Sequence, residues 1–371
     1  MTTRRPAGRR ESIPTGNSFN RKTQSHRNAV MHLITGGSGF LGNLIANRLH
    51  QRGEQVRILD VWEDHRRPRA IEYAQCDILD RDGVRRAMQG AEIVHHNVAL
   101  VPLTKAKKQF WAVNVEGSRL AAEEAVRAGV RCFVHMSSSA IFGLPRQCPI
   151  TDDTPTGPVE EYGQAKLAGE LAVREVCERA GLPLIVIRPR TILGEGRLGI
   201  FQLLFRWIKD GRNVYVIGPG TGGFQFVHAH DLMDAYMLAL DADRPGIYNV
   251  GTDRFGSLRE SLERLIAHAG TKSRVKSLPE RLSIGALRTL DFLWLCPLAP
   301  WHYLTYHKPF HFDVKKLHDL GWKPRYSNDE MLAESYNSFL SQRIDPAEAG
   351  ARSPHRKAVK EGVLWLVRQF S

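Results

Sequence analysis

The chain lacks the features that mark disulfide-rich, metal-binding and membrane-spanning proteins. Only five cysteines occur among 371 residues, and no two have the C-x-x-C spacing of zinc or iron–sulfur ligands. This pattern argues against a disulfide scaffold or a metal site and fits a reducing compartment. No apolar run reaches the roughly 18–20 residues that span a bilayer, and no apolar core of a secretion signal is present. We therefore expect a cytoplasmic protein with no metal.

Acidic residues are scarce at the ends of the chain, and this explains much of the net charge of +13. Residues 1–30 carry seven basic residues and one acid, and residues 344–371 carry five basic residues and three acids. The body between them has only a small positive excess. A nucleic-acid platform needs its basic residues on the folded surface, so we expect no nucleic-acid partner.

The two ends of the chain also differ from the body in composition. Residues 1–29 are rich in Arg, Ser, Thr and Asn with few apolar residues, which predicts a disordered basic tail; an organelle transit peptide is the alternative. Residues 344–371 are expected to form a linker and an amphipathic helix. One face of that helix suits a peripheral membrane contact, a dimer contact or docking on the protein's own surface; its apolar residues are Val359, Val363, Leu366, Val367 and Phe370.

Short apolar runs alternate with helical patterns from residue 31 onward. The predicted strands are 32–35, 56–59, 71–76, 93–96, 132–136 and 184–187, and the predicted helices are 41–52, 111–128, 162–180, 201–210, 232–240 and 257–269. Such alternation is typical of an α/β fold with a doubly wound, Rossmann-like parallel sheet. We assign the nucleotide-binding domain to 30–190 with parts of 220–255. A smaller α/β substrate lobe, irregular over 271–310, is expected over 191–343.

The turn between the first strand and the first helix contains three regularly spaced glycines. Gly36, Gly39 and Gly42 flank Phe40 and Leu41 in the sequence TGGSGFLG. Glycine permits a tight turn, a close approach of backbone to a pyrophosphate and close packing of helix on strand. The following helix N-terminus presents backbone N–H groups to the phosphates. The motif therefore predicts a dinucleotide site.

An acid at the end of the second strand favours NAD over NADP as the cofactor. Asp60 follows Gly42 by 18 residues, where a carboxylate accepts hydrogen bonds from ribose hydroxyls and repels a 2′-phosphate. Arg66 and Arg67 lie close behind, and binding of a 2′-phosphate by them is the alternative. Asp77 and Ile78, after the third strand, are placed to meet the adenine.

Tyr162 and Lys166 are spaced i, i+4 and therefore share one face of a predicted helix. An ammonium beside a phenol is expected to lower the tyrosine pKa from about 10 and to prepare the phenol for proton transfer during hydride transfer. Upstream, the serine run 137–139 follows a strand, at the sheet edge where open parallel sheets bind ligands.

These landmarks, in this order, resemble those of the extended short-chain dehydrogenase/reductases of the NAD-dependent epimerase/dehydratase superfamily. The resemblance covers about 31–340 and is carried by GGSGFLG (36–42), CDI (76–78), HHNVAL (95–100), NVEGS (114–118), MSSSAIFG (136–143), YGQAK (162–166), RPRTILGEG (188–196), FVHAHDL (226–232) and LGWKP (320–324). It implies that Ser138, Tyr162 and Lys166 are catalytic.

The same resemblance implies several supporting roles. Asn114 would support the helix and the lysine, Ala99 would border the cofactor, and Pro189 would flank the nicotinamide end together with Tyr162 and Lys166. The family also implies a homodimer through the predicted helices 111–128 and 162–180.

Two departures from the family pattern bear on the reaction. Dehydratases of the family carry an Asp-Glu pair after the active hydroxyl, whereas this chain has Ser139 and Ala140, which disfavours elimination of water. Sugar-nucleotide members carry an arginine before the F-V-H segment, whereas this chain has Phe224 and Gln225. Arg190, Arg197, Arg206 and Lys308 are the cations that could compensate, and a solvated surface position is the alternative for each.

The substrate lobe contains an apolar, aromatic stretch between residues 290 and 306. Its rings are Phe292, Trp294, Trp301, Tyr303 and Tyr306. This stretch resembles the 3β-hydroxysteroid dehydrogenase and sterol-decarboxylase branch, in which the region covers an apolar substrate; a plain lobe core is the alternative. Arg190, His228 and Ser138 are the candidate substrate contacts.

Three functions follow from these observations. The leading one is an NAD-dependent oxidoreductase acting on a secondary alcohol, as a nucleotide-sugar epimerase. The second is a dehydrogenase of a sterol-like or isoprenoid alcohol. The third is a catalytically idle nucleotide sensor or scaffold, against which the intact Ser-Tyr-Lys set argues.

Overall fold

The computed structural model describes residues 29–101, 107–195, 197, 199–293, 295–296, 298 and 300–341, excepting the side chains of 107 and 108. The predicted basic tail and the predicted C-terminal amphipathic helix lie outside these residues, and so does Trp294.

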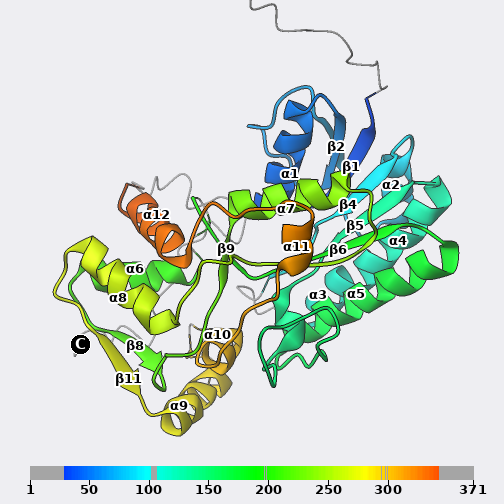
Figure 1. Cartoon of the computed structure of the whole chain (residues 1–371). Coiled ribbons are helices and arrows are strands. Elements are labelled where there is room, and N and C mark those ends of the chain that lie inside the picture. The colour runs from blue at the N-terminus through cyan, green and yellow to red at the C-terminus, as the bar shows by residue number, and fades with distance from the viewer. Residues whose placement is uncertain are drawn as a thin grey trace, which may run out of the picture.

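A seven-stranded parallel sheet forms the larger part of the molecule (Figure 1). Its strand order is β10-β6-β5-β4-β1-β2-β3. The strands are β1 (Met31–Thr35), β2 (Gln55–Asp60), β3 (Glu72–Gln75), β4 (Ile93–His96), β5 (Cys132–Met136), β6 (Leu184–Pro189) and β10 (Gly246–Val250). The order reverses between β1 and β4, so their connections leave on opposite sides. At such a switch point the carboxyl ends of the strands form a ligand crevice.

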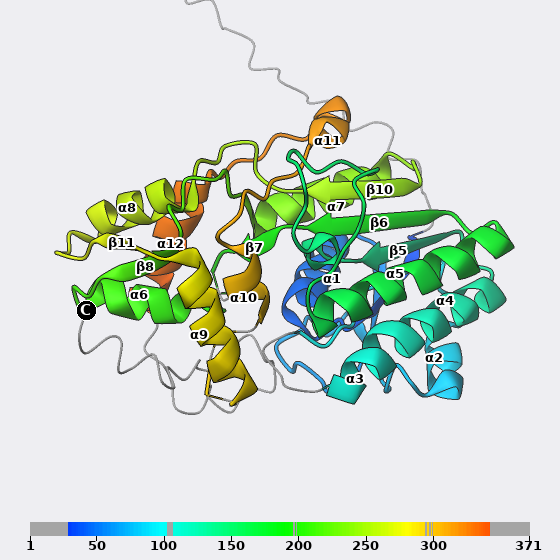
Figure 2. The same ribbon diagram turned by 90° about the horizontal axis from the view of Figure 1, so that it is seen from below.

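Helices cover both faces of the sheet, and the predicted Rossmann-like architecture is confirmed. Helices α1 (Phe40–Gln51) and α7 (Ala229–Asp241) pack on one face, and α2 (Arg81–Met88), α4 (Gly117–Ala128) and α5 (Glu161–Ala180) on the other (Figure 2). Both α4 and α5 end at glycines with positive φ, Gly129 and Gly181, because a left-handed residue closes the last turn without a Cβ clash.

The predicted single helix over 111–128 is divided in the structure. A short α3 (Lys107–Trp111) runs into a π-helical turn, η1 (Ala112–Glu116), before α4 begins. The wider turn carries Asn114 against α5, where a Cβ on Gly169 would lie 2.0 Å from the Asn114 carbonyl oxygen. Inserted π turns of this kind occur frequently at functional sites.

A second group of elements lies beyond β6. It comprises β7 (Thr191–Leu193), α6 (Phe201–Lys209), β8 (Val214–Ile217), β9 (Phe226–His228), α8 (Leu258–Ala269), β11 (Val275–Leu278), α9 (Glu280–Phe292), α10 (Pro300–Thr305), α11 (Lys315–Asp319) and α12 (Asn328–Ser341). Strands β8 and β11 pair in parallel, as do β7 and β9. The core of this lobe is aromatic, with Phe205, Phe224 and Phe310 all buried.

The prediction that 271–310 is irregular is wrong, because β11, α9 and α10 lie within it. Two of the prolines in this segment stand at helix starts. Pro279 is the N-cap of α9 and Pro300 is the first residue of α10. Proline is tolerated there because the first backbone N–H groups of a helix have no partner within it.

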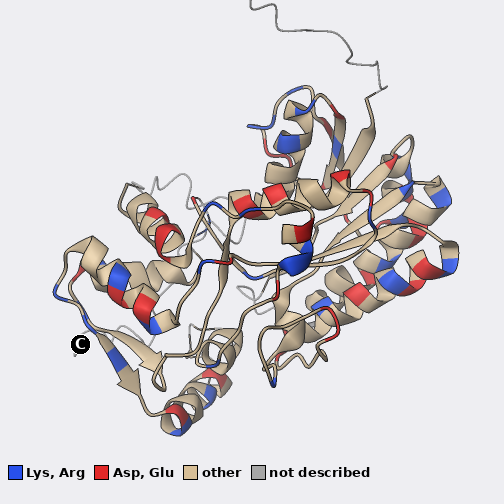
Figure 3. Cartoon of the chain, in the orientation of Figure 1, with Lys and Arg blue, Asp and Glu red and all other residues tan. Residues whose placement is uncertain are grey.

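The charged residues of the described surface are intermixed in sign. Figure 3 shows Lys and Arg alternating with Asp and Glu along the helices of both lobes. Among the described residues, no helix is long and apolar enough to cross a membrane.

Candidate active site

A pocket of about 450 Å³ opens at the carboxyl edge of the sheet, between the sheet and α10. Its walls come from the glycine-rich turn, the ends of β2, β5 and β6, the start of α5 and the segment that follows β7. Residues of the predicted glycine, serine and tyrosine motifs all line this pocket.

The glycine-rich turn leaves no room for side chains. A Cβ on Gly36, which has a φ of +69°, would lie 2.7 Å from the Val98 Cα, and a Cβ on Gly42 would lie 2.2 Å from the Gly36 carbonyl oxygen. Gly39 is the N-cap of α1, and no side chain caps that first turn. Gly36, Gly39, Phe40 and Leu41 line the pocket. The turn therefore offers backbone N–H groups and the helix dipole to an anion.

Asp60 stands at the end of β2 and lines the pocket. Its carboxylate accepts hydrogen bonds from the backbone N–H of Ser38, at 3.0 Å, and of Val61, at 2.8 Å. Burial raises the pKa of Asp60, and these backbone hydrogen bonds act in the opposite direction. The residue is thus held at the tip of the glycine-rich turn, where it was predicted to meet ribose.

The two arginines that could bind a 2′-phosphate are paired with carboxylates of their own loop. Arg66 forms an ion pair with Asp64, at 3.1 Å, and Arg67 with Glu63, at 2.6 Å. Neither arginine lines the pocket. A 2′-phosphate would have to displace these carboxylates, which favours NAD.

The remaining predicted cofactor residues divide into two groups. Ala99 and Pro189 line the pocket. Asp77 and Ile78 do not: Ile78 is buried against Gly117, and exposed Asp77 accepts a hydrogen bond from the Leu79 N–H, at 3.0 Å.

The three consecutive serines after β5 have different partners. Ser137 donates to Glu170, at 2.6 Å, and Ser139 accepts from Arg190, at 3.2 Å. Ser138 caps the short helix η2 (Ser139–Phe142) by accepting from the Ala140 N–H, at 3.2 Å, and its hydroxyl is close enough to the Tyr162 phenol to lower the pKa of that phenol. Ser138 is therefore the serine that the fold turns toward the tyrosine.

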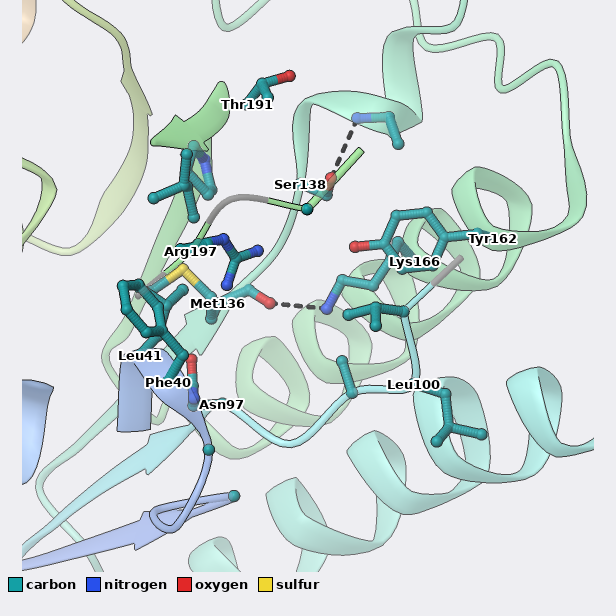
Figure 4. Close-up of a pocket in the computed structure, with 18 of the residues that line it drawn as sticks. Phe40, Leu41, Asn97, Leu100, Met136, Ser138, Tyr162, Lys166, Thr191 and Arg197 are labelled. Carbon is teal, nitrogen blue, oxygen red and sulfur yellow. Dashed lines mark hydrogen bonds between the residues drawn. The ribbon is translucent and has the colours of Figure 1, made fainter. Parts of the chain in front are cut away.

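Tyr162 and Lys166 project from the first turns of α5 into the same part of the pocket (Figure 4). The N-terminus of α5 is fixed by Glu160, whose carboxylate accepts from the Tyr162 and Gly163 N–H groups. The buried Lys166 ammonium donates to the Met136 carbonyl oxygen, at 2.7 Å. Burial lowers the pKa of Lys166 to about 8, against the opposing charge of Glu170.

The expected lowering of the tyrosine pKa is wrong for this arrangement. Burial raises the pKa of Tyr162, because its phenolate would be poorly solvated. The Ser138 hydroxyl and the positive charge of Arg197 act in the opposite direction but do not outweigh burial. Arg197 is thus a cation that acts on the phenol, and the spacing of the tyrosine and lysine does not reveal it.

Asn114 fixes the loop after β4. Its side-chain oxygen accepts from the Leu100 N–H, at 2.9 Å, and its amide donates to the Leu100 carbonyl, at 3.2 Å. Leu100 and Ala99 form one wall of the pocket. The support that the resemblance implied is thus given to this loop; a contact of Asn114 with the lysine stays a prediction.

Arg190 is buried rather than solvated on the surface. Its guanidinium lies between the rings of Phe224 and Phe310, with centroids at 4.9 and 3.9 Å, and donates to the Gln225 carbonyl, at 3.0 Å. Burial lowers its pKa to about 9. Phe224, the residue that replaces the family's arginine, therefore packs against a guanidinium supplied from the end of β6, and Arg190 lines the pocket.

His228, predicted as a substrate contact, does not line the pocket. His228 is buried away from the pocket lining, stacks on Tyr326 with ring centroids 3.7 Å apart and contacts Glu334 at 3.2 Å. Because both partners lie about a hundred residues away in sequence, no local pattern identifies them.

Sequence reasoning left the opposite wall of the pocket largely unassigned. Arg197, named above as a cation that could compensate for the family's arginine or as a solvated surface charge, is half-buried in this wall. Trp301 and Tyr306 line the pocket as well as belonging to the lobe core, whereas Phe292 is 82% exposed. The apolar and aromatic members of this wall are Ile192, Ile200, Phe201, Trp301 and Tyr306.

The family model for the NAD-dependent epimerase/dehydratase family matches residues 32–251, more than half of the chain. The chain belongs to this family. The predicted resemblance and the prediction of an NAD-dependent enzyme with a Rossmann-like sheet are thereby confirmed.

Three family relatives illustrate the range of similarity. An uncharacterised protein, y4nG of Sinorhizobium fredii, is 41% identical over 90% of this chain and 85% of its own length. UDP-arabinose 4-epimerase 1 of Arabidopsis thaliana is 28% identical, covering 69% and 71%. Sterol demethylase protein B of Methylococcus capsulatus is 30% identical, covering 68% and 79%. This range includes both substrate classes considered above.

The fold is also similar to that of solved family structures. The UDP-glucose 4-epimerase of Thermotoga maritima with UDP-glucose superimposes with a TM-score of 0.68. That match covers 84% of this chain and 99% of that chain at 22% identity, and it supports the fold.

Proposed function

We propose that this family member oxidises and re-reduces a secondary alcohol with NAD, and that it is a nucleotide-sugar epimerase. The observation that carries the proposal is the convergence of Ser138, Tyr162 and Lys166 at the end of β5, in the same pocket as the glycine-rich turn. Close backbone approach at Gly36, the uncapped start of α1 and the Asp60 carboxylate fit a dinucleotide.

Each of the three residues has a defined part in the proposed reaction. NAD, when bound, accepts and returns the hydride. Tyr162, as the phenolate, takes the hydroxyl proton of the substrate and becomes the phenol, and Ser138 positions that substrate oxygen by hydrogen bonding. Lys166, held by the Met136 carbonyl, supplies a positive charge that favours the phenolate. Charge from Arg197 adds to this effect.

Elimination of water is not part of the proposed reaction. Ser139 and Ala140, at the positions of the dehydratase acid pair, are both buried, and the Ser139 hydroxyl is occupied by Arg190. Among the described residues that line the pocket, Asp60 is the only carboxylate, and it belongs to the glycine-rich end. A general acid and base for dehydration are therefore missing from the described wall.

A sterol-like or isoprenoid alcohol is the second candidate substrate. It is favoured by the apolar wall that includes Ile200, Phe201 and Trp301 and by the similarity to sterol demethylase protein B. A dehydrogenase of this kind would release its reduced cofactor after each turnover, whereas an epimerase must keep it.

The decisive experiment is mass spectrometry of the small molecules released when the purified protein is denatured, followed by substrate assays. We expect retained NAD and interconversion of UDP-glucose with UDP-galactose or of the corresponding pentose pair. A protein that binds added NAD reversibly and oxidises an apolar alcohol, but no UDP-sugar, contradicts the epimerase and supports the alternative. A Tyr162→Phe variant with full in vivo function would support the third hypothesis, a catalytically idle nucleotide sensor or scaffold.

Pairing of two copies stays a prediction. Helices α4 and α5 lie side by side on the outer face of the sheet, as the predicted homodimer requires.

A further inference from the structure

Arg197 is a cation inside the pocket for which the described residues supply no carboxylate. No acidic side chain among them lies within 4.0 Å of its guanidinium. Burial lowers the pKa of Arg197 to about 10. A partly buried cation without an ion-pair partner is costly, so a site that contains one is suited to an anionic ligand.

The guanidinium lies toward the glycine-rich turn. Its central carbon is 5.3 Å from the centroid of the Phe40 ring, and Phe40 is the first residue of α1. Figure 4 shows Arg197 on the same side of the pocket as Phe40 and Leu41. The side chain thus comes from the segment after β7 and reaches the turn predicted to hold phosphates.

The other cations of the described pocket wall have hydrogen-bond partners. Lys166 donates to the Met136 carbonyl, and Arg190 donates to Ser139 and to the Gln225 carbonyl. Arg197 has no side-chain hydrogen bond with the described residues; its backbone N–H donates to the Gly194 carbonyl, at 3.1 Å. Among the cations of the described pocket wall, Arg197 is therefore the one whose side chain forms no hydrogen bond with the described residues.

We propose that Arg197 binds the pyrophosphate of the bound dinucleotide from the side opposite α1, so that the cofactor is held by both lobes. This inference rests on the proposed binding of NAD. The planar guanidinium binds two phosphate oxygens at once, while the first turn of α1 supplies backbone N–H groups. A cofactor held in this way dissociates slowly, as an enzyme that reuses its NAD requires.

Titration calorimetry with matched ligands tests the proposal. The ligands are NAD, ADP-ribose, which keeps the pyrophosphate, and adenosine, which has no phosphate. The proteins are the full-length wild type, Arg197→Gln, Arg197→Lys and, as a control of equal charge change, Arg281→Gln, an exposed residue of α9 outside the pocket. Retained nucleotide is first removed from all four.

We expect Arg197→Gln to raise the dissociation constants of NAD and ADP-ribose roughly ten- to hundredfold and to leave that of adenosine unchanged. Arg197→Lys keeps the charge but not the planar fork, so its loss should be smaller. The Arg281→Gln control should behave as wild type. Arg197→Gln should also be purified with less NAD than wild type.

Two results would overturn the proposal. Unchanged binding of NAD and ADP-ribose, with a raised KM for substrate alone, would assign Arg197 to an anionic group of the substrate instead. An equal loss for adenosine would show a general disturbance of the pocket. Failure of the wild type to bind NAD is a different result, since it rejects the proposed function itself.

Discussion

The two walls of the pocket are built in different ways. The sheet wall is made of backbone approaching closely at Gly36 and of polar side chains fixed by hydrogen bonds, such as Ser138 and Lys166. The opposite wall, from the second lobe, presents mainly rings and aliphatic groups, including Phe201 and Trp301, with Arg197 as its exception. In the proposed function, the first wall would provide cofactor binding and proton transfer, and the second would determine which alcohol enters.

The cores behind the two walls also differ: the one behind the sheet wall contains more polar groups, and the one behind the lobe wall is more aromatic. Behind the sheet wall lie buried titratable groups: His32 contacts His95 at 2.8 Å, and His95 contacts Tyr236 at 2.6 Å. Behind the lobe wall, Phe224, Phe226 and Phe310 pack ring against ring. We thus expect pH to act mainly on the sheet, and substitutions in the lobe wall to change substrate binding more than chemistry.

Tyr162→Phe should have the largest effect, because it removes the proton acceptor from the sheet wall. The expected loss in kcat is about 10²–10⁴-fold, with NAD affinity unchanged. Steady-state kinetics and calorimetry on the same protein measure both. A variant with normal kcat would contradict the assignment of proton transfer to the sheet wall.

Acid should destabilise the sheet more than the lobe. Burial lowers the pKa of His32 to about 4 and that of His96 to about 3, from 6.5. Below pH 6.5 these histidines bind protons in the unfolded chain but not in the native state, so the free energy of unfolding falls as pH falls. Each such histidine contributes about 1.4 kcal/mol per pH unit over this range.

Urea unfolding at successive pH values measures this slope. His32→Gln should lower the slope of the free energy of unfolding against pH by the contribution of about one bound proton. His65→Gln, at an exposed position, should leave this slope unchanged. A free energy of unfolding that stays constant from pH 7 down to 5 would contradict the prediction.

Gly42→Ala tests the close backbone approach. The new Cβ would lie 2.2 Å from the Gly36 carbonyl oxygen, so the variant should lose about 1–3 kcal/mol of stability and bind NAD more weakly. The matched control is Gly285→Ala, in exposed α9 with no atom within 4 Å of the new Cβ. It should gain about 0.4–1 kcal/mol, because alanine restricts the unfolded chain. Thermal unfolding distinguishes the two.

Ile200→Ala should have the smallest effect and acts on the lobe wall. Removing this half-buried side chain should raise the substrate KM about tenfold and leave kcat and NAD affinity unchanged. Leu282→Ala, 75% exposed on α9, is the control. If Ile200→Ala weakened NAD binding instead, the division of roles between the walls would be wrong.

Much of the sheet wall could be predicted from sequence because its signals are local. The glycine spacing of 36–42 lies in one turn, and Tyr162 and Lys166 lie one helical turn apart, so a short segment fixes each arrangement. The predicted strands 93–96 and 132–136 match β4 and β5. The lobe wall could not be predicted in the same way, since α10 and the segment after β7 meet only through packing.

The sequence by itself determined the alternation of strands and helices, the glycine-rich turn and the family. Tertiary structure decided which polar residues share the pocket. It turned Ser138 toward Tyr162, withdrew His228 into a stack on Tyr326 and buried Arg190 between two rings. These outcomes depend on contacts between residues far apart in the chain, where burial sets the pKa and the available partners, and no local spacing encodes that.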